Sequence, residues 1–320
     1  MTRRALRVAA VAGVTALVAL PWLPTPRAFA GAPAGEGLTV EERLVARYGG
    51  SILTVHAVLA IRMRFGGQSF DQEQKDDVTA VVVDASGLLM LSDGSQEIAA
   101  VERQFPGAEL SMTPKSLQVT VPGDETDHDA ILVARDASIG LAFVQVMGLS
   151  GKALTPVDLS ATVEPKLLAP LYGISRLGRG FDYALEVRRL YTRQHVVAPR
   201  PMWGVAGEFM GTGLPAFDAT GTAVGILMTQ PGTVSEASGG SSLSMGLFLL
   251  PIPAVNRLAE QAKKKVPEAL EKAKKAAAEA PAAPPKDASP EGVLPVPPPK
   301  DPKDPKDPKD PPPKEPPAGG

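Results

Sequence analysis

The 320-residue chain has no cysteine, few aromatic residues and three histidines. The lack of cysteine excludes disulfides, thiolate metal sites and a cysteine nucleophile. The 33 Lys and Arg residues nearly balance the 35 Asp and Glu residues, so no global field attracts nucleic acid or an acidic substrate. Long amphipathic helical patterns between apolar runs are also lacking, and this argues against a parallel α/β sheet.

The first thirty residues have the pattern of an export signal. Three arginines within residues 3–7 precede an apolar run over residues 8–20, and Ala-Phe-Ala at 28–30 has the form of a cleavage site. The apolar run is shorter than the roughly 20 residues that span a bilayer. We therefore expect a signal peptide at 1–30, export to the periplasm or the extracellular space, and no membrane span after cleavage. An uncleaved membrane anchor is the alternative.

Four zones follow the expected signal peptide. Residues 31–37 form a linker of small residues, and residues 38–261 have a globular composition. Helical periodicity begins near Pro253, and residues 262–279 are rich in Ala, Lys and Glu, which predicts a solvated helix that Pro267 kinks or restarts. The Pro-, Lys- and Asp-rich tail at 280–320 has too few apolar side chains to offset the entropy of ordering, so we expect disorder. Such a tail is an inert spacer or contacts the cell wall or another protein.

The globular zone has the pattern of many short strands. Apolar residues 78–83 and 88–91 flank an Asp-Ala-Ser-Gly turn and predict a hairpin, and a second hairpin is predicted over residues 216–228. Further strands are predicted at residues 117–121, 130–134, 141–146 and 246–250. Short strands with turns about every ten residues predict an all-β barrel or sandwich.

Four segments in this order resemble those of a known family. They are the hairpin over residues 80–91, RDASIGLAFV (135–144), GTGLPAFD (211–218) with the turn and strand after it, and GLFLLPIP (246–253). They are similar to the segments of HtrA-type trypsin-like serine proteases that precede the catalytic His, surround the catalytic Asp, form the nucleophile loop and enter the closing helix. The resemblance covers residues 51–261. It implies two six-stranded antiparallel β-barrels with a cleft between them and a C-terminal helix, and no PDZ-like domain follows.

The resemblance places the catalytic His, Asp and Ser at Gly94, Gly140 and Thr212. Glycine can neither accept a proton nor orient an imidazole, and a threonine hydroxyl without a base is a poor nucleophile. The resemblance also implies a vestigial oxyanion loop, which has no attached chemistry. The residues of that loop are Met210, Gly211, Thr212 and Gly213. Because the stretch from Gly94 to Gly140 is longer than in the family, we expect an insertion within it.

None of the three histidines is expected to replace the missing base. His56 lies in an apolar, strand-like segment, His128 in an acidic loop, and His195 near the end of a strand. Structural or surface roles are expected for them, since a general base must reach its nucleophile within about 3 Å. His128, with the carboxylates of Asp124, Asp127 and Asp129, would at most bind a cation weakly, and the spacing matches no EF-hand. No metal or cofactor is predicted.

The sequence therefore favours an exported, non-catalytic HtrA-type pseudoprotease that binds an extended peptide or an envelope protein by strand addition. The alternative is an active serine-type endopeptidase with a displaced triad, which would need His128 or His195 near a hydroxyl. A third hypothesis is a structural envelope protein in which the tail matters most. A histidine nitrogen hydrogen-bonded to a serine or threonine hydroxyl between the barrels would contradict the non-catalytic interpretation.

Overall fold

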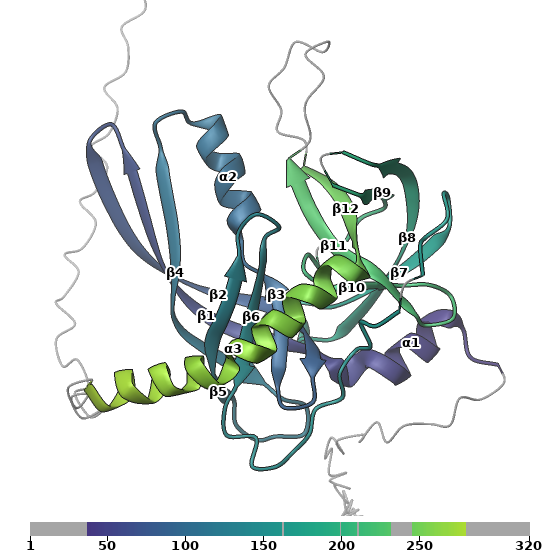
Figure 1. Ribbon diagram of the computed structural model, residues 1–320, viewed down its shortest axis with the longest axis horizontal. Helices are drawn as coiled ribbons and strands as arrows, with labels where there is room; N and C mark the ends of the chain where they lie inside the picture. The colour runs from purple at the N-terminus through teal and green to yellow at the C-terminus, as the bar shows by residue number, and fades with distance from the viewer. Residues whose placement is uncertain (1–36, 162, 199, 210, 232–244, 280–320) are drawn as a thin grey trace, which may run out of the picture. The chain divides into compact units, whose positions relative to one another are not determined.

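The computed structural model describes residues 37–161, 163–198, 200–209, 211–231 and 245–279 (Figure 1). The predicted signal peptide at 1–30, linker residues 31–36 and the predicted tail at 280–320 lie outside the described residues. Among the described residues, no helix is both long and apolar enough to cross a bilayer.

The strands form two closed antiparallel barrels of six strands each. The first barrel has the order β1-β2-β3-β6-β5-β4 and the second the order β10-β11-β12-β9-β8-β7. The strands of the first barrel are β1 (Ile52–Phe65), β2 (Gln68–Asp84), β3 (Leu88–Ser92), β4 (Glu109–Thr120), β5 (His128–Asp136) and β6 (Leu141–Val146). Those of the second are β7 (Pro170–Arg176), β8 (Leu185–Val196), β9 (Met202–Ala206), β10 (Pro215–Phe217), β11 (Ala223–Pro231) and β12 (Met245–Pro251).

This architecture confirms the predicted all-β double barrel. The β2–β3 hairpin is paired in the register Ala80↔Leu91, and the β10–β11 hairpin in the register Ala216↔Gly225. Strand β6 spans the residues that the sequence pattern predicted for it. Two helices and strands β7 and β9 were not predicted, and β1, β2 and β4 extend beyond the predicted strand segments.

Alternate residues of the inner strands enter different hydrophobic clusters. Leu89 and Leu91 on β3 lie in the cluster inside the first barrel, whereas Leu88 and Met90 belong to a cluster shared by both barrels. On β11, Val224 and Leu227 lie inside the second barrel, and Ile226 belongs to the shared cluster. These strands are buried on both faces, which is why they are continuous apolar runs in the sequence.

Helix α1 (Val40–Tyr48) precedes the first barrel and was not predicted. Thr39 and Glu42 form a capping box at its start, in which Glu42 N–H donates to Thr39 Oγ1 at 3.2 Å. Tyr48 stacks on Phe217 at 4.4 Å between ring centroids and donates its hydroxyl to Gly221 O at 2.7 Å. Helix α1 thereby ties the start of the globular chain to the β10–β11 hairpin of the second barrel.

Figure 1 shows β1 and β2 as a long hairpin that extends beyond the first barrel, near α2 (Ser95–Gln104). The sequence predicted a strand over residues 78–83 alone, because residues 68–77 are mostly polar and remain exposed in the structure. Helix α3 (Ile252–Glu279) begins next to Pro253, where the helical periodicity was expected to begin, and it runs through Pro267 instead of restarting there. Its first half packs on the shared cluster through Val255 and Ala259.

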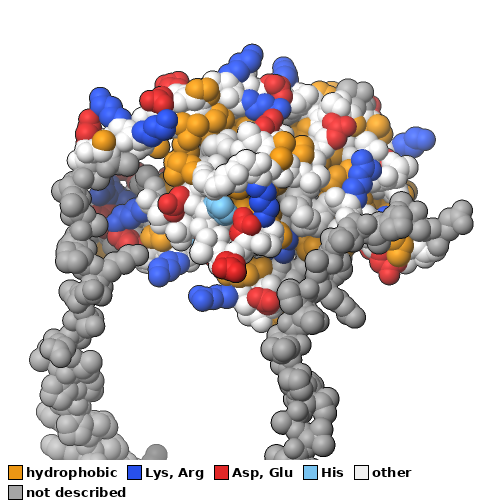
Figure 2. Space-filling model, turned by 90° about the horizontal axis from the view of Figure 1, so that it is seen from below, with side chains coloured by type: hydrophobic (Ala, Val, Ile, Leu, Met, Phe, Trp, Pro, Cys, Tyr) orange, Lys and Arg blue, Asp and Glu red, His pale blue; other side chains and the backbone are white. Residues whose placement is uncertain are grey.

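Charges of both signs are interspersed over the face that Figure 2 shows. Neither Lys and Arg nor Asp and Glu gather there into a continuous field. This agrees with the near-zero net charge of the chain.

Candidate functional site

The first two positions expected for a catalytic triad lie side by side. Gly94 follows β3 and is the N-cap of α2, with a left-handed φ of 70°. Gly140 has a φ of 71° and ends the turn between β5 and β6. The N–H of Asp93 donates to Gly140 O at 3.0 Å, so the β3–α2 turn and the β5–β6 turn are in direct contact.

The third position, in the loop at residues 211–213, packs against the end of β3. The N–H of Gly213 donates to Leu227 O at 2.7 Å. A Cβ atom on Gly213 would lie 2.7 Å from the carbonyl carbon of Leu91 and closer still to the backbone nitrogen of Ser92. The structure therefore brings Gly94, Gly140 and the loop of Thr212 together between the barrels. Met210, the first residue of the expected oxyanion loop, lies outside the described residues.

Side chains from neighbouring elements occupy the space beside the two glycines. A Cβ atom on Gly94 would lie 2.7 Å from Met112 Cε, and a Cβ atom on Gly140 would lie 2.9 Å from Gln96 Cγ. Met112 comes from β4 and Gln96 from α2, both within the stretch where the sequence predicted an insertion. Met112 and Gln96 thus occupy the space in which the side chains of a base and its orienting carboxylate would be needed.

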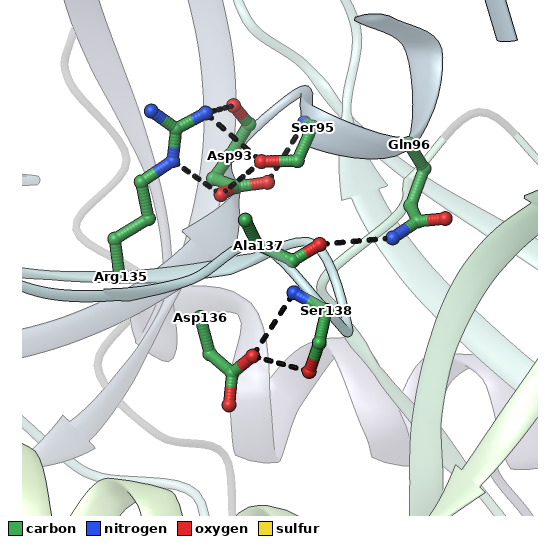
Figure 3. Close-up of polar contacts among 7 residues, drawn as sticks. All are labelled: Asp93, Ser95, Gln96, Arg135, Asp136, Ala137 and Ser138. Atoms are coloured by element: carbon green, nitrogen blue, oxygen red, sulfur yellow. Dashed lines mark hydrogen bonds and ion pairs between the residues drawn. The ribbon is translucent and has the colours of Figure 1, made fainter. Parts of the chain in front are cut away.

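A buried carboxylate next to these glycines is fully engaged by donors (Figure 3). The Asp93 side chain is 2% exposed and accepts hydrogen bonds from Ser95 N–H at 2.8 Å, Ser95 Oγ at 2.5 Å and Arg135 Nε at 2.5 Å. Such pairing offsets the cost of burying a charge. On the other side of the turn, Gln96 Nε2 donates to Ala137 O at 3.1 Å. These contacts hold the β3–α2 turn against β5.

Two of the three histidines have partners that are not hydroxyl groups. His128 lies 2.7 Å from Asp124 Oδ2 through Nε2 and 3.3 Å from Met147 O through Nδ1. His195 stacks on Trp203, with 4.4 Å between ring centroids and 22° between the planes. Neither histidine has the hydroxyl contact that the endopeptidase alternative required of it.

The acidic loop before β5 does not assemble a cation site. Asp124 accepts from Lys152 Nζ at 2.6 Å as well as contacting His128, so its charge is already balanced. Over the described ranges of the chain, no group of three His, Cys, Asp or Glu side chains is placed to hold a metal ion.

His56 does contact a hydroxyl, and the sequence analysis missed this arrangement. Its Nδ1 atom lies 2.5 Å from Asp77 Oδ1 and its Nε2 atom 2.8 Å from Thr120 Oγ1. The hollow around it, about 840 Å³, is lined by both barrels. A histidine nitrogen hydrogen-bonded to a threonine hydroxyl between the barrels, the condition stated above, is therefore present. It lies apart from Gly94 and Thr212. No local motif marks it, because it depends on the strand register that sets His56 opposite Asp77.

Asp77 is a carboxylate held in its ionised form. Desolvation is the largest single influence and opposes ionisation, yet the hydrogen bonds from His56 and Tyr183 together lower the pKa of Asp77 below its ordinary value. The Tyr183 hydroxyl donates to Asp77 Oδ2 at 3.0 Å and comes from the loop between β7 and β8. One carboxylate thus links a strand of the first barrel to a loop of the second.

Arg176, at the end of β7, is a second link between the barrels. Its guanidinium donates to Ile52 O at 2.6 Å, Tyr183 O at 2.9 Å and Gly49 O at 3.1 Å. Burial lowers the pKa of Arg176 from its usual high value. Carbonyl oxygens therefore solvate this buried cation and hold the β7–β8 loop in place.

One backbone edge beside the triad positions has no strand paired with it in the described part of the chain. Leu227 on β11 exchanges hydrogen bonds with Gly213 and Leu214, so its N–H and C=O point away from β12. Alternation along a strand directs the N–H and C=O of Thr229 to the same side. Strand β10 ends its pairing before that point, and no strand of the described part pairs with Thr229 there. Helix α2 lies next to this part of β11, since Thr229 Oγ1 donates to Glu97 Oε1 at 3.1 Å.

No protein-family model matches this sequence, and no curated protein matches it closely enough to count as a relative.

Proposed function

We propose that this protein is an exported, non-catalytic relative of HtrA-type proteases that binds an extended peptide or a partner protein. The observation that carries the proposal is the contact between the loop of Thr212 and the backbone of β3, with Gly94 and Gly140 beside it. The three positions that the resemblance assigns to a triad lie close together, two of them have no side chain, and a Cβ atom at either glycine would contact Met112 or Gln96. A nucleophile without a base and an orienting acid loses most of its reactivity.

The open edge at Thr229 supports peptide binding. An extended peptide gains affinity from main-chain hydrogen bonds when it adds to a free strand edge. Helix α2 lies next to this edge, because the Thr229 side chain contacts Glu97. Main-chain hydrogen bonds of this kind do not depend on the sequence of the peptide. Selectivity among peptides would therefore come from the residues of α2.

The place of action that we propose is the cell envelope, outside the cytoplasm. This proposal is supported by the sequence pattern of residues 1–30. The tail at 280–320 is proposed to act as a spacer or as a further contact to the wall or to another protein.

Binding of fluorescently labelled β-casein, measured by anisotropy, tests this function. The wild type is expected to bind without cleaving the probe. Thr229→Pro removes the edge N–H and should weaken the affinity about tenfold, the effect of one unmade backbone hydrogen bond. Thr229→Val is the matched control, because it keeps the N–H while removing the hydroxyl contact with Glu97, and it should bind as the wild type does.

Two outcomes would refute the proposal. One is turnover of casein that is lost in Thr212→Ala. The other is equal binding by Thr229→Pro and Thr229→Val, which would exclude the β11 edge as the peptide site.

A second candidate function, serine-type endopeptidase activity with a displaced triad, is favoured by the contacts of His56 with Asp77 and Thr120. The contact that argues against it is the bond from Thr120 Oγ1 to Asp127 Oδ1 at 2.6 Å, because the hydroxyl proton points away from the imidazole. A fluorophosphonate probe distinguishes the two functions. An adduct on Thr120 that disappears in Thr120→Val would establish the endopeptidase, and an unlabelled protein would exclude it.

A further inference from the structure

The hollow around His56 lies between the outer face of the first barrel and the β7–β8 loop of the second. Its floor is made by β1, β2 and β4, and Gly178, Arg179 and Tyr183 of the second barrel line the other side. The hollow is separate from the triad positions and from the β11 edge, whose residues are not among those that line it.

A chain of hydrogen bonds crosses one side of this hollow. It runs from Asp77 to His56, from His56 to Thr120, and from Thr120 to Asp127 in the β4–β5 loop. The second oxygen of Asp77 accepts from Tyr183, whose ring also meets the His56 ring edge-on at 5.4 Å between centroids. The chain therefore joins β1, β2, β4, the β4–β5 loop and the β7–β8 loop.

The direction of the bond from Thr120 to Asp127 sets which protons His56 needs for the complete chain. A threonine hydroxyl has one proton, and here it is donated to the Asp127 carboxylate. Thr120 Oγ1 can then only accept at His56 Nε2, so Nε2 must carry a proton. Nδ1 must carry one too, because its partner is the ionised Asp77. The complete chain requires an imidazolium.

The β7–β8 loop is held in a strained shape. Asp182 and Tyr183 have φ values of 50° and 52°, in the left-handed region that non-glycine residues disfavour. Two such residues in succession are unfavourable and persist where tertiary contacts hold them. The Tyr183–Asp77 bond and the Arg176 bond to Tyr183 O are such contacts.

We propose that His56 is a proton-dependent latch that joins the two barrels across this hollow and holds the β4–β5 and β7–β8 loops in place. A neutral imidazole has a single N–H and can serve Asp77 or Thr120, but not both. Loss of the proton therefore breaks the chain at one end and leaves the carboxylates of Asp77 and Asp127 without their shared cation. Histidine is the side chain that ordinarily changes charge between about pH 5 and 8.

The other charged and titratable groups around the hollow do not replace the proton. Those that line it are Lys75, Asp76 and Asp77 on β2, Asp127 in the β4–β5 loop, and Arg179 and Tyr183 in the β7–β8 loop. Lysine and arginine keep their charge throughout the neutral range, and tyrosine keeps its proton.

Hydrogen exchange measured by mass spectrometry at pH 5.5 and pH 8.5, corrected for the intrinsic chemical rate, tests the latch on the full chain. Peptides covering residues 121–127 and 178–183 should lose about tenfold protection at the higher pH, the effect of one charge-assisted hydrogen bond. His56→Gln should show low protection at both pH values, with no change between them. His128→Gln and His195→Gln are the controls, and both should keep the wild-type response.

Asp127→Asn provides a second variant should His56→Gln fail to fold. It removes the carboxylate that takes the Thr120 proton, so the neutral imidazole can accept from Thr120 and the pH response should shrink. The proposal is overturned if the wild-type loops show equal protection at both pH values. It is also overturned if the response persists in His56→Gln and Asp127→Asn, or disappears in His128→Gln, which would assign it to the His128–Asp124 pair.

Discussion

At the scale of single residues, glycines determine how closely the barrels approach each other. Gly213 has a φ of 79°, and its Cα faces the backbone at the end of β3. A side chain there would meet backbone atoms, which cannot rotate away as a flexible side chain can. The close approach of the 211–213 loop to β3 therefore requires glycine at this position.

Gly213→Ala should destabilise the protein by about 3 kcal/mol, from the left-handed backbone and from overpacking against Leu91 and Ser92. Gly123→Ala is the matched control, since its φ of 85° is similar but no atom lies within 4 Å of the added Cβ. The control should lose about 1 kcal/mol, the cost of the backbone conformation alone. Urea unfolding of both variants measures the difference, and equal losses would show that the loop does not press on β3.

At the scale of elements, we expect α2 to prevent a working triad even if the three residue types are restored. The helix begins at the position expected for the catalytic His, and its second residue, Gln96, covers the position expected for the Asp. An imidazole at residue 94 would need a left-handed backbone and the space now filled by Met112.

We therefore expect the triple variant Gly94→His, Gly140→Asp, Thr212→Ser to remain unlabelled by a fluorophosphonate. It should also be about 2–4 kcal/mol less stable, because two residues are forced into left-handed conformations. Thr212→Ser alone should be as stable as the wild type and equally unreactive. Robust labelling of the triple variant at the hydroxyl of residue 212 would show that α2 leaves room for a working triad.

The strands and helices also show which parts of the fold could be predicted from the sequence. The doubly buried strands were predictable, because β3 and β6 are largely apolar runs between turn residues. Helix α1 was missed although Thr39 and Glu42 have capping-box spacing, which was a usable signal. The outer part of β2 could not be predicted from periodicity, since its residues face solvent on both sides and pair with β1 through the backbone.

The same limit applies to the candidate site. The positions Gly94, Gly140 and Thr212 were located by resemblance, and the structure brings them together. The contacts of His56 were not predictable, because Asp77 and Thr120 come from two neighbouring strands and meet it through the register of β1 with β2 and β4. Two-strand registers are set by long-range packing rather than by a local motif.

At the scale of the whole molecule, stability should depend on pH in the acid range. The pKa of Asp77 is lowered as described above. Hydrogen bonds from Ser86, first from its N–H, lower the pKa of Asp84, and those from Ser160, first from its hydroxyl, lower the pKa of Asp158. Because these pKa values are lower in the folded protein, the unfolded chain binds more protons as the pH falls below the ordinary value of 3.8. The stabilisation is present above that pH and is lost below it.

Thermal unfolding between pH 6 and pH 2.5 should therefore show a constant midpoint down to about pH 4 and a steep fall below it. The Asp77→Asn variant should have a lower unfolding midpoint at pH 6 than the wild type. Its midpoint should also fall less steeply as the pH is lowered. A midpoint that stays constant to pH 2.5, or an unchanged slope in Asp77→Asn, would contradict the assignment of these carboxylates.

The shared hydrophobic cluster has a consequence for how this chain can be divided. Residues such as Met90 and Phe143 point out of the first barrel, and Ile226 and Leu250 point out of the second, into one common core. A fragment ending after β6 would still form a closed barrel, but it would expose the apolar residues of the shared cluster to water. We therefore expect the smallest piece that folds by itself to contain both barrels, α1 and the first half of α3, because Leu44, Tyr48 and residues up to Ala262 belong to this core.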